Sequence, residues 1–349
     1  MEQKKAFSLE EISRWINAEI FPPSHKELKI TGFTTLESAK ENELAFITSE
    51  KFLKQAKESL AAAIVAPYDL EIKTKTLVCV PNVWKAVVHL LDRFYPEPSL
   101  SNFIHPSAYI HPETQISKNV SIGACAVVEK GVVIEDQTRV GALSYLGENV
   151  RIGKNCLIHP SVTILRNCKI GDNVIVHSGV VIGSDGFKFE IIDGLPRKIR
   201  QVGRVVVESD VEIGANTCID RASFTETRIA RGAKLDNLIQ VAHNVNIGSY
   251  CMIASQTGIA GSSKIGQACI IGGQAGIRDN IEIGDHVMVA GKTGVSKNTP
   301  SHSKVFGFVA MPVKKAFKRD AMINRLPQLV QTVKELEKRL AKLEKKIGN

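Results

Sequence analysis

Residues 152–170 read IGKNCL-IHPSVT-ILRNCK-I, with isoleucine at every sixth position. The same spacing of Ile, Val or Leu runs unbroken over fourteen positions from Ile104 to Ile182, and over twelve from Ile229 to Val295. A strand repeats every 2 residues and a helix every 3.6, whereas a period of six is typical of hexapeptide solenoids. The sequence therefore predicts a mainly-β fold, a left-handed parallel β-helix whose aliphatic residues point into a triangular prism.

Each hexad is expected to form one flat side and one corner of the prism, and stacking at about 4.8 Å buries a continuous aliphatic column. The glycine that often follows the aliphatic residue is expected to relieve a Cβ penalty at the corner. The period fails at 184–204 and again at 222–228, where four extra residues are inserted. Insertions in solenoids map to surface loops that often bind ligands, so we expect the functional site near these two segments.

Three segments are predicted along the chain: an α/β domain at 1–100, the β-helix at 101–300, and a loop with a helix at 301–349. Within the first, Ser8 and Glu11 form a capping box ahead of an apolar helical face. The remaining elements are expected as follows: strands at 44–47, 62–66 and 77–80, helices at 50–59 and 83–94, a linker at 97–102, and a loop at 297–311.

The composition is that of an ordinary globular protein, with 44% hydrophobic residues and no run of eighteen apolar residues. The first fifteen residues lack an apolar core of the kind found in secretory signals. Seven cysteines without a C-x-x-C pair argue against a disulfide framework or a zinc site. Four of them, at a small-residue position of the hexad, are interpreted as core residues in a reducing cytoplasm: Cys156, Cys168, Cys251 and Cys269.

Positive charge is concentrated at the C-terminus, where residues 311–349 hold eleven Lys and Arg against four Asp and Glu. Such a stripe suits an acidic partner, whether nucleic acid, an anionic membrane surface or an acidic carrier protein; a solvated helix face is the alternative. The same segment carries an a/d heptad seam, expected to form a parallel three-stranded bundle or to pack within one chain. The seam comprises Met322, Leu326, Leu329, Val333, Leu336, Leu340, Leu343 and Ile347.

Among nine histidines, His243 stands out because it lies in the turn Val241-Ala-His-Asn-Val-Asn, in the coils just after both interruptions. An imidazole with an ordinary pKa near 6.5 can take a proton at neutral pH. Asp236, about one turn earlier, offers a carboxylate to orient it. The residues alone thus suggest a general base without specifying the reaction.

Five stretches of the chain resemble the LpxD family of UDP-3-O-(3-hydroxyacyl)glucosamine N-acyltransferases. They are DGF (185–187), QVGRVVVESDVEIGANTCIDR (201–221), KLDNLIQVAHNVNIG (234–248), and, in the family's uridine-binding domain, GFTTLESAKENELAFITSEKF (32–52) and AAAIVAP (61–67). The resemblance spans essentially the whole chain. It implies a cytoplasmic homotrimer that transfers a 3-hydroxyacyl group from acyl carrier protein to the 2-amine of a UDP-3-O-acyl-glucosamine.

The resemblance also implies roles for individual residues. His243 matches the general base, Asp236 the carboxylate that polarises it, and Gly261 the backbone N–H that stabilises the oxyanion. No metal or bound cofactor is implied, because phosphopantetheine arrives on the carrier protein. Nucleic acid is not implied, and any membrane contact would be peripheral. Substrate-binding positions are Phe46, which stacks on uracil, with Ser49, Phe52, Asn237, Gln240, Asn244 and Asn280; carrier docking is expected at Lys314, Lys315, Lys318, Arg319 and Arg325.

The chain departs from the family pattern at three of these positions. Ser49 and Phe52 stand where Asn and Tyr are frequent, and Asn280 stands where the family has a second histidine. The segment that resembles the acyl-chain groove reads Val289-Ala-Gly-Lys-Thr-Gly-Val, with Gly291 and Gly294 where bulkier residues occur. Glycine at these positions is expected to admit a longer or branched chain.

Four other functions fit parts of the sequence. A related O-acyltransferase shares the β-helix and the histidine but generally lacks a domain like 1–100. An acetyl-CoA-dependent sugar acetyltransferase would differ in its donor. A γ-class carbonic anhydrase needs three histidine ligands, and no second histidine has suitable spacing around His243. A non-catalytic solenoid leaves the interruptions and the His243 turn unexplained.

Overall fold

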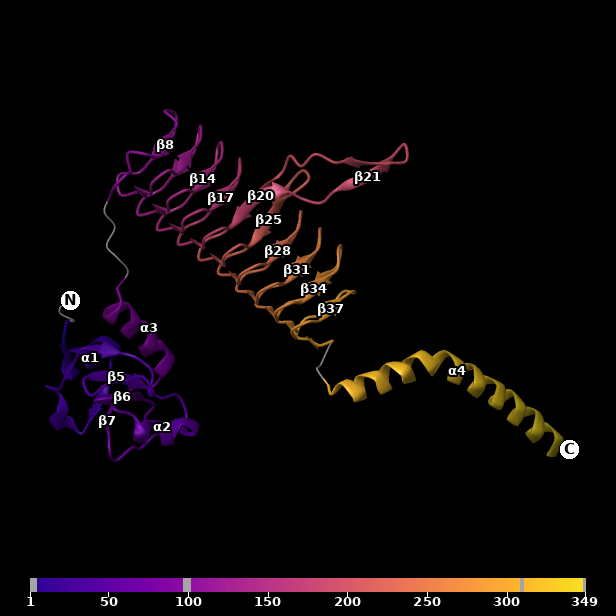
Figure 1. The fold of residues 1–349 in the computed structure, drawn as a ribbon, viewed down its shortest axis with the longest axis horizontal. Helices are drawn as coiled ribbons and strands as arrows, with labels where there is room; N and C mark the ends of the chain where they lie inside the picture. Colours follow the sequence, from indigo (N-terminus) through magenta and orange to yellow (C-terminus); the bar gives the residue numbers. More distant parts are fainter. Residues whose placement is uncertain (1–4, 97–101, 308–310, 348–349) are drawn as a thin grey trace. The chain divides into compact units, whose positions relative to one another are not determined.

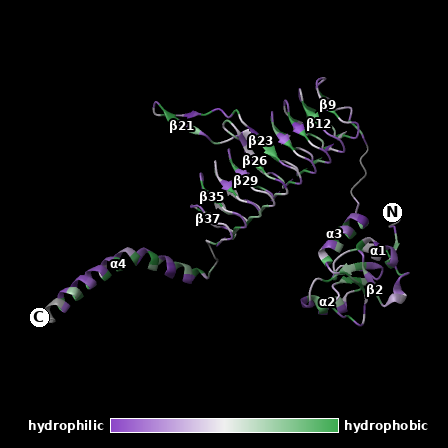
Figure 2. Ribbon diagram, turned by 180° about the vertical axis from the view of Figure 1, so that it is seen from behind, coloured by the Kyte–Doolittle hydropathy of each residue, from purple (hydrophilic) through white to green (hydrophobic). Residues whose placement is uncertain are grey.

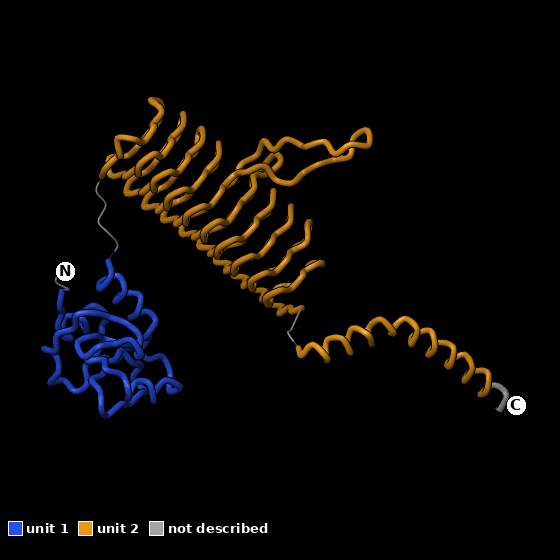
Figure 3. The backbone as a smooth tube through the Cα atoms, in the orientation of Figure 1, with its two compact units in different colours: residues 1–99 blue, residues 100–349 orange. Residues whose placement is uncertain are grey.

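The computed structural model describes residues 5–96, 102–307 and 311–347, and the contacts divide the chain into two units, 1–99 and 100–349 (Figure 3). Most of the predicted linker at 97–102 lies outside the described residues. The first unit is built around a five-stranded sheet in the order β2-β7-β6-β5-β4, parallel except for β2. Its strands are β2 (Glu19–Phe21), β4 (Gly32–Phe33), β5 (Glu43–Phe46), β6 (Ala63–Ala66) and β7 (Thr76–Cys79), with the small pair β1 (Phe7–Ser8) and β3 (Lys29–Ile30) beside it.

The helices of this unit follow the predicted pattern closely. The capping box is present, with Glu11 N–H donating to Ser8 Oγ at 3.2 Å ahead of α1 (Leu9–Ile16). The stretch expected as one helix at 50–59 is a 3₁₀ turn, η2 (Glu50–Phe52), followed by α2 (Leu53–Glu58). A second 3₁₀ turn is η1 (Pro23–His25), and α3 (Val83–Phe94) is capped by Asn82. Strands β1 to β4 were not anticipated because they are only two or three residues long.

The second unit begins with a prism of three parallel sheets, in which each strand pairs with the strand one coil later (Figure 1). We name the sheets by their first strands. The β8 face comprises β8 (Tyr109–Ile110), β11 (Val127–Val128), β14 (Tyr145–Leu146), β17 (Thr163–Ile164), β20 (Val181–Asp185), β25 (Cys218–Arg221), β28 (Gln240–Val241), β31 (Gly258–Ile259), β34 (Gly276–Ile277) and β37 (Gly294–Val295). The β9 face comprises β9 (Gln115–Ile116), β12 (Val133–Ile134), β15 (Arg151–Ile152), β18 (Lys169–Ile170), β23 (Arg204–Val207), β26 (Glu226–Ile229), β29 (Asn246–Ile247), β32 (Lys264–Ile265) and β35 (Glu282–Ile283). The β10 face comprises β10 (Ser121–Ile122), β13 (Arg139–Val140), β16 (Leu157–Ile158), β19 (Ile175–Val176), β24 (Glu212–Ile213), β27 (Lys234–Leu235), β30 (Met252–Ile253), β33 (Ile270–Ile271), β36 (Met288–Val289) and β38 (Lys304–Val305).

The three parallel sheets confirm the parallel β-helix predicted from the six-residue period, and its aliphatic residues form one continuous core. The four cysteines interpreted as core residues are buried in it, and burial raises the pKa of Cys156 to about 11. The corner glycines avoid a Cβ penalty, as expected, and the penalty comes from the next coil. Positive φ falls two residues later, as at Asn155, whereas a Cβ at Gly153 would lie 2.6 Å from the carbonyl carbon of Gly171 in the next coil. These glycines are needed because successive coils approach closely.

The first interruption forms a hairpin, β21 (Phe189–Ile192) and β22 (Leu195–Lys198), that projects from the prism (Figure 1). Its turn, Asp193-Gly194, has positive φ at both residues, as two-residue hairpin turns favour. The buried Arg221 donates to the carbonyl oxygens of Gly183 at 2.6 Å and Gly203 at 3.3 Å. One guanidinium therefore holds both ends of the insertion to the coil that follows.

The segment expected as a loop at 297–311 contains strand β38, which extends the β10 face by pairing with β36. The long helix α4 (Val313–Ile347) includes Pro327, and hydrophilic colours dominate it in Figure 2. Seven described side chains of the heptad seam are exposed, from 51% at Val333 to 60% at Met322. The described residues contain no helix both long and apolar enough to cross a membrane.

Candidate functional site

His243 follows β28 at the corner where the β8 face turns into the β9 face, and its side chain is half-buried. Two glycines flank the imidazole. A Cβ at Gly186, in the first interruption, would lie 2.8 Å from His243 Cβ, and a Cβ at Gly261, one coil onward, would lie 2.8 Å from both Cε1 and Nε2. The absence of side chains at both positions creates the space in which the ring lies.

The hydrogen bonds around Asn244 determine the tautomer of His243. Asn244 Oδ1 accepts from the backbone N–H of Ser223 at 3.1 Å and lies 3.1 Å from His243 Nδ1. Because a backbone N–H can only donate, this atom of Asn244 is the oxygen, and Nδ1 must therefore carry a proton to donate to it. The lone pair of the neutral ring is then on Nε2, the nitrogen beside Gly261, which is where a general base needs it.

Gly261, whose Cβ position lies 2.8 Å from that nitrogen, also has a backbone N–H to offer. Its carbonyl oxygen accepts from Asn280 N–H at 3.1 Å, but among the described residues its own N–H has no acceptor. An N–H without a partner next to a basic nitrogen is suited to an oxyanion, and such a donor contributes about 3–4 kcal/mol to a transition state.

A buried carboxyl group, missed from the sequence, lies close to the histidine. Asp220 is 8% exposed and accepts from Ser184 Oγ at 2.7 Å and from Gln240 Nε2 at 3.0 Å. Burial raises the pKa of Asp220, whereas the bonds from Ser184 and Gln240 and the nearby His243 act to lower it. The signal in the sequence was the pair Asp220-Arg221, two charged residues directly after a core isoleucine.

Asp236 does not hold the imidazole within one chain, contrary to expectation. It follows β27 at the preceding corner, and its carboxylate accepts from the backbone N–H groups of Asn237 at 2.8 Å and Ser255 at 3.1 Å. Asn244 fills the orienting role instead. The physical reason is that consecutive hexads place their second and third residues at different corners of the prism.

Three predicted substrate-binding residues lie on the prism surface and have partners in it. Gln240 Nε2 bonds Asp220, and Asn237 Oδ1 accepts from Ala215 N–H at 2.6 Å. Asn280 lies on the same corner as Asn244 but two coils later, and its Nδ2 donates to Asp279 at 2.7 Å. Asn280 therefore stands near Gly261, through their backbone hydrogen bond, while Asn237 belongs to the corner of Asp236.

The predicted uracil platform lies in the first unit. Phe46 ends β5, half-buried, with its ring centroid 5.7 Å from that of Phe33 and 5.7 Å from that of Trp84. Trp84 is 61% exposed and Phe52 is 43% exposed. Ser49 precedes η2 and makes no capping bond with its side chain. Trp84 was missed because a tryptophan at the second position of a helix carries no distinctive pattern.

A strip without side chains runs along the β8 face from the histidine corner. Gly258, Gly276 and Gly294 stand in register on β31, β34 and β37, and a Cβ at any of them would meet nothing within 4 Å. Gln240 precedes them in the same column, on β28. A Cβ added at Gly291, at the corner before Gly294, would lie 3.2 Å from the carbonyl oxygen of Gly273. The three glycines leave a surface without side chains that spans two steps between coils, about 10 Å at 4.8 Å per coil.

The predicted docking residues lie in the first turns of α4. The side chains of Lys314, Lys315, Lys318 and Arg325 are exposed, while Arg319 donates to Asp320 Oδ1 at 2.8 Å. The described residues contain no cluster of three or more His, Cys, Asp or Glu side chains arranged to hold a metal ion.

Comparison with known proteins assigns this arrangement to a family. The UDP-3-O-acylglucosamine N-acyltransferase of Protochlamydia amoebophila (strain UWE25) is 42% identical over 351 residues, which cover 99% of each chain. The enzyme of the same name from Methylacidiphilum infernorum (isolate V4) is 43% identical over 90% of each chain. The chain belongs to the LpxD family. The family model for UDP-3-O-(3-hydroxymyristoyl) glucosamine N-acyltransferase, LpxD, matches residues 27–93.

This LpxD family member also matches a repeat model and solved structures. The bacterial transferase hexapeptide model matches residues 131–166 and 149–184. Among solved structures, Arabidopsis UDP-N-acetylglucosamine acyltransferase is 22% identical, with a TM-score of 0.49 over 59% of this chain and 71% of that one. The LpxD model includes Phe46, Ser49 and Phe52, so the departures at Ser49 and Phe52 lie inside the matched part of the family's own domain.

Proposed function

We propose that this acyltransferase, in the cytoplasm, moves a 3-hydroxyacyl group from acyl carrier protein to the 2-amine of a UDP-3-O-acyl-glucosamine, a step of lipid A biosynthesis. The observation that carries the proposal is the His243 corner. A ring with its Nε2 lone pair toward Gly261, a free N–H on Gly261 and a bare glycine strip beside them provide a base, an oxyanion donor and a surface for an acyl chain.

The proposed reaction uses these groups in order. His243 Nε2 takes a proton as the amine nitrogen attacks the thioester carbonyl carbon, and the Gly261 N–H donates to the oxygen that becomes negative. The carbon–sulfur bond then breaks as the amide forms, and the imidazolium returns its proton to the leaving thiolate. No bound cofactor is required, because the pantetheine thiol belongs to the carrier substrate.

The donor separates this proposal from the acetyltransferase alternative. Purified protein should consume 3-hydroxyacyl carrier protein at least 100-fold faster than acetyl-CoA when each is offered with the same UDP-3-acyl-glucosamine acceptor. Equal rates, or a preference for acetyl-CoA, would contradict the proposed donor.

We expect the glycine strip to set the length of the acyl chain. Replacing Gly294 by methionine places a long side chain at the far end of the strip, where a Cβ has open space, so the β-helix should be undisturbed. The variant should prefer chains shorter by several carbons, with the longest wild-type substrate slowed about tenfold. The measurement is the distribution of product chain lengths from a pooled set of acyl carrier substrates. An unchanged distribution would show that the acyl chain does not bind along the strip.

We expect the basic residues of α4 to attract the acidic carrier protein. Changing Lys314, Lys315 and Lys318 to glutamate should raise the KM for the carrier about tenfold at low salt, with kcat unchanged, because steering acts on encounter. The matched control changes Lys334, Lys338 and Lys342, also in α4 and about 30 Å further along it at 1.5 Å per residue. Equal effects of the two triple variants would mean that net charge, and not a docking site, is responsible.

We further propose a homotrimer in which the exposed seam of α4 forms a parallel bundle. Because Asp236 lies at a different corner from His243, it can act on an imidazole only from a neighbouring copy. Mixing two weakly active proteins, His243→Ala and Asp236→Asn, with subunit exchange should then restore activity to about a quarter of wild type. No recovery in mixed trimers verified by mass would show that Asp236 has no role across the interface.

A further inference from the structure

The second interruption of the repeat, at 222–228, borders a pocket of about 700 Å³ beside the β9 face. Its lining includes the basic side chains of Arg151, Lys169 and Arg204, together with Phe224, Thr225 and Glu226. Residues 202–204 come from the end of the first interruption, so the pocket is formed by both interruptions and by two regular coils below them.

Two cations in this pocket face each other without compensation. Arg151 and Lys169 stand in register on the neighbouring strands β15 and β18, and both are exposed. Neither forms an ion pair with any described residue, and the next residue of this column is Val206. Like charges directly opposite on adjacent strands destabilise a sheet. An anion between them would remove that cost.

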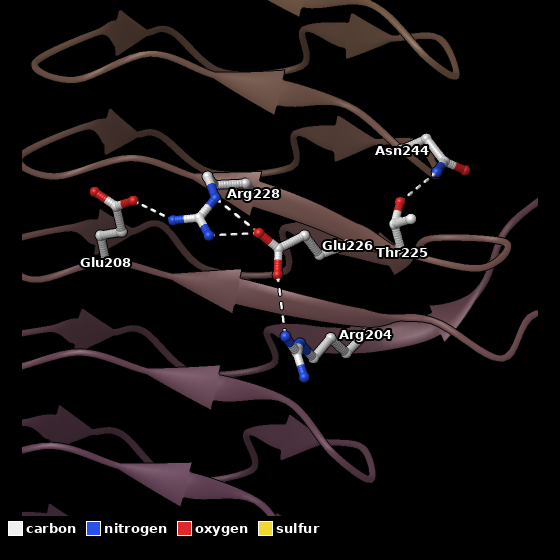
Figure 4. Close-up of polar contacts among 6 residues, drawn as sticks. All are labelled: Arg204, Glu208, Thr225, Glu226, Arg228 and Asn244. Atoms are coloured by element: carbon white, nitrogen blue, oxygen red, sulfur yellow. Dashed lines mark hydrogen bonds and ion pairs between the residues drawn. The ribbon is translucent and has the colours of Figure 1, made fainter.

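Arg204 adds a third cation with an unused donor. Its guanidinium reaches Glu226 Oε2 at 3.4 Å, but its Nε is buried without a hydrogen-bond partner among the described residues. Glu226 is also held by Arg228, which in turn bonds Glu208 (Figure 4). Together with Arg151 and Lys169, these residues make a set of six charged side chains. Four are positive and two are negative. The acidic groups are thus satisfied by arginine, and a net charge of +2 remains.

A hydrogen bond links the pocket to the His243 corner. Thr225, which lines the pocket, accepts through Oγ1 from Asn244 Nδ2 at 3.5 Å (Figure 4). Asn244 is the residue that fixes the His243 tautomer. A ligand group bound here would therefore lie one residue away from the hydrogen bond that prepares the base.

We propose that this pocket binds a phosphate group of one of the two reactants. This inference rests on the proposed function, since both the nucleotide-sugar diphosphate and the phosphodiester of phosphopantetheine supply the same chemistry. Phosphate suits the set because guanidinium groups bind its oxygens through paired N–H donors while lysine contributes a compact charge. The exposed Phe224 gives the pocket an apolar rim for the organic part of the ligand.

The test uses the double variant Arg151→Gln with Lys169→Gln in the full-length protein. Its control is Lys118→Gln with Arg139→Gln, which removes the same charge from prism residues without ion pairs. Titration with inorganic pyrophosphate should show binding to wild type and control, weakened at least tenfold in the double variant and falling steeply with salt. Separate titrations with UDP and with coenzyme A identify the source.

Steady-state kinetics complete the assignment. A tenfold rise in KM for the UDP-sugar alone assigns the pocket to the diphosphate, and a rise for the carrier alone assigns it to phosphopantetheine. Unchanged titrations together with both KM values unchanged would overturn the proposal. If the wild type transfers no acyl group but the double variant still shows weaker pyrophosphate binding, the phosphate site is supported and the proposed function is contradicted.

Discussion

Replacing His243 by alanine is expected to lower kcat at least about 100-fold at neutral pH, because the variant has no group at the corner to take the proton from the attacking amine. The side chain is outside the aliphatic column, so the β-helix should keep its stability. The measurement is steady-state turnover with saturating carrier substrate, accompanied by thermal unfolding.

The control for this variant is His286→Ala, which removes a different corner imidazole, an exposed one stacked 5.0 Å from His302. That variant should turn over within twofold of wild type. Near-normal turnover of the His243 variant would show that the base is a different residue.

Replacing Gly261 by alanine is expected to have an effect of similar size. The added Cβ would lie 2.8 Å from His243 Nε2 and Cε1, a distance at which the ring must move. A displacement of about 1 Å in a catalytic group can cost about 100-fold in rate, and the methyl group also crowds the N–H proposed to hold the oxyanion. We therefore expect kcat to fall about 100-fold with little change in KM.

A second glycine variant separates this local clash from a general loss of stability. Gly194→Ala lies at the tip of the projecting hairpin, where nothing is within 4 Å, although its φ of +75° makes the change cost about 1 kcal/mol. It should retain wild-type turnover. If Gly261→Ala also retains turnover, the imidazole is not confined as the structure indicates.

The spacing of Ile, Val and Leu was sufficient to predict the prism. A period of six matches neither an isolated strand nor a helix, but it places one inward side chain on each side of a three-sided coil. It could not identify the partner of His243. Asp236 and Asn244 are both near in sequence, and only the corner geometry shows that the amide of Asn244 reaches Nδ1 while the carboxylate of Asp236 bonds backbone N–H groups. Contacts across a corner depend on side-chain direction, which a repeat pattern does not specify.

The interruptions were located correctly, but their contents were harder to predict. Arg221 was part of a recognised motif, yet its role in holding both ends of the hairpin depends on carbonyl groups at 183 and 203 that are distant in sequence. The basic pocket likewise joins Arg151 and Lys169 to residues beyond the first interruption. Such sites become visible only when the number of coils between two segments is known.

The central claim, that a 3-hydroxyacyl group is joined to the amine of the sugar, is tested most directly by tandem mass spectrometry of the product. The enzyme would be supplied with a mixed pool of hydroxyacyl carrier proteins and a UDP-3-acyl-glucosamine acceptor. The account predicts one added hydroxyacyl group, with fragments that place it on the 2-amine as an amide resistant to mild alkali. An added hydroxyacyl group that mild alkali releases together with the acceptor's own O3 ester, or an acetyl group added from acetyl-CoA, would contradict it.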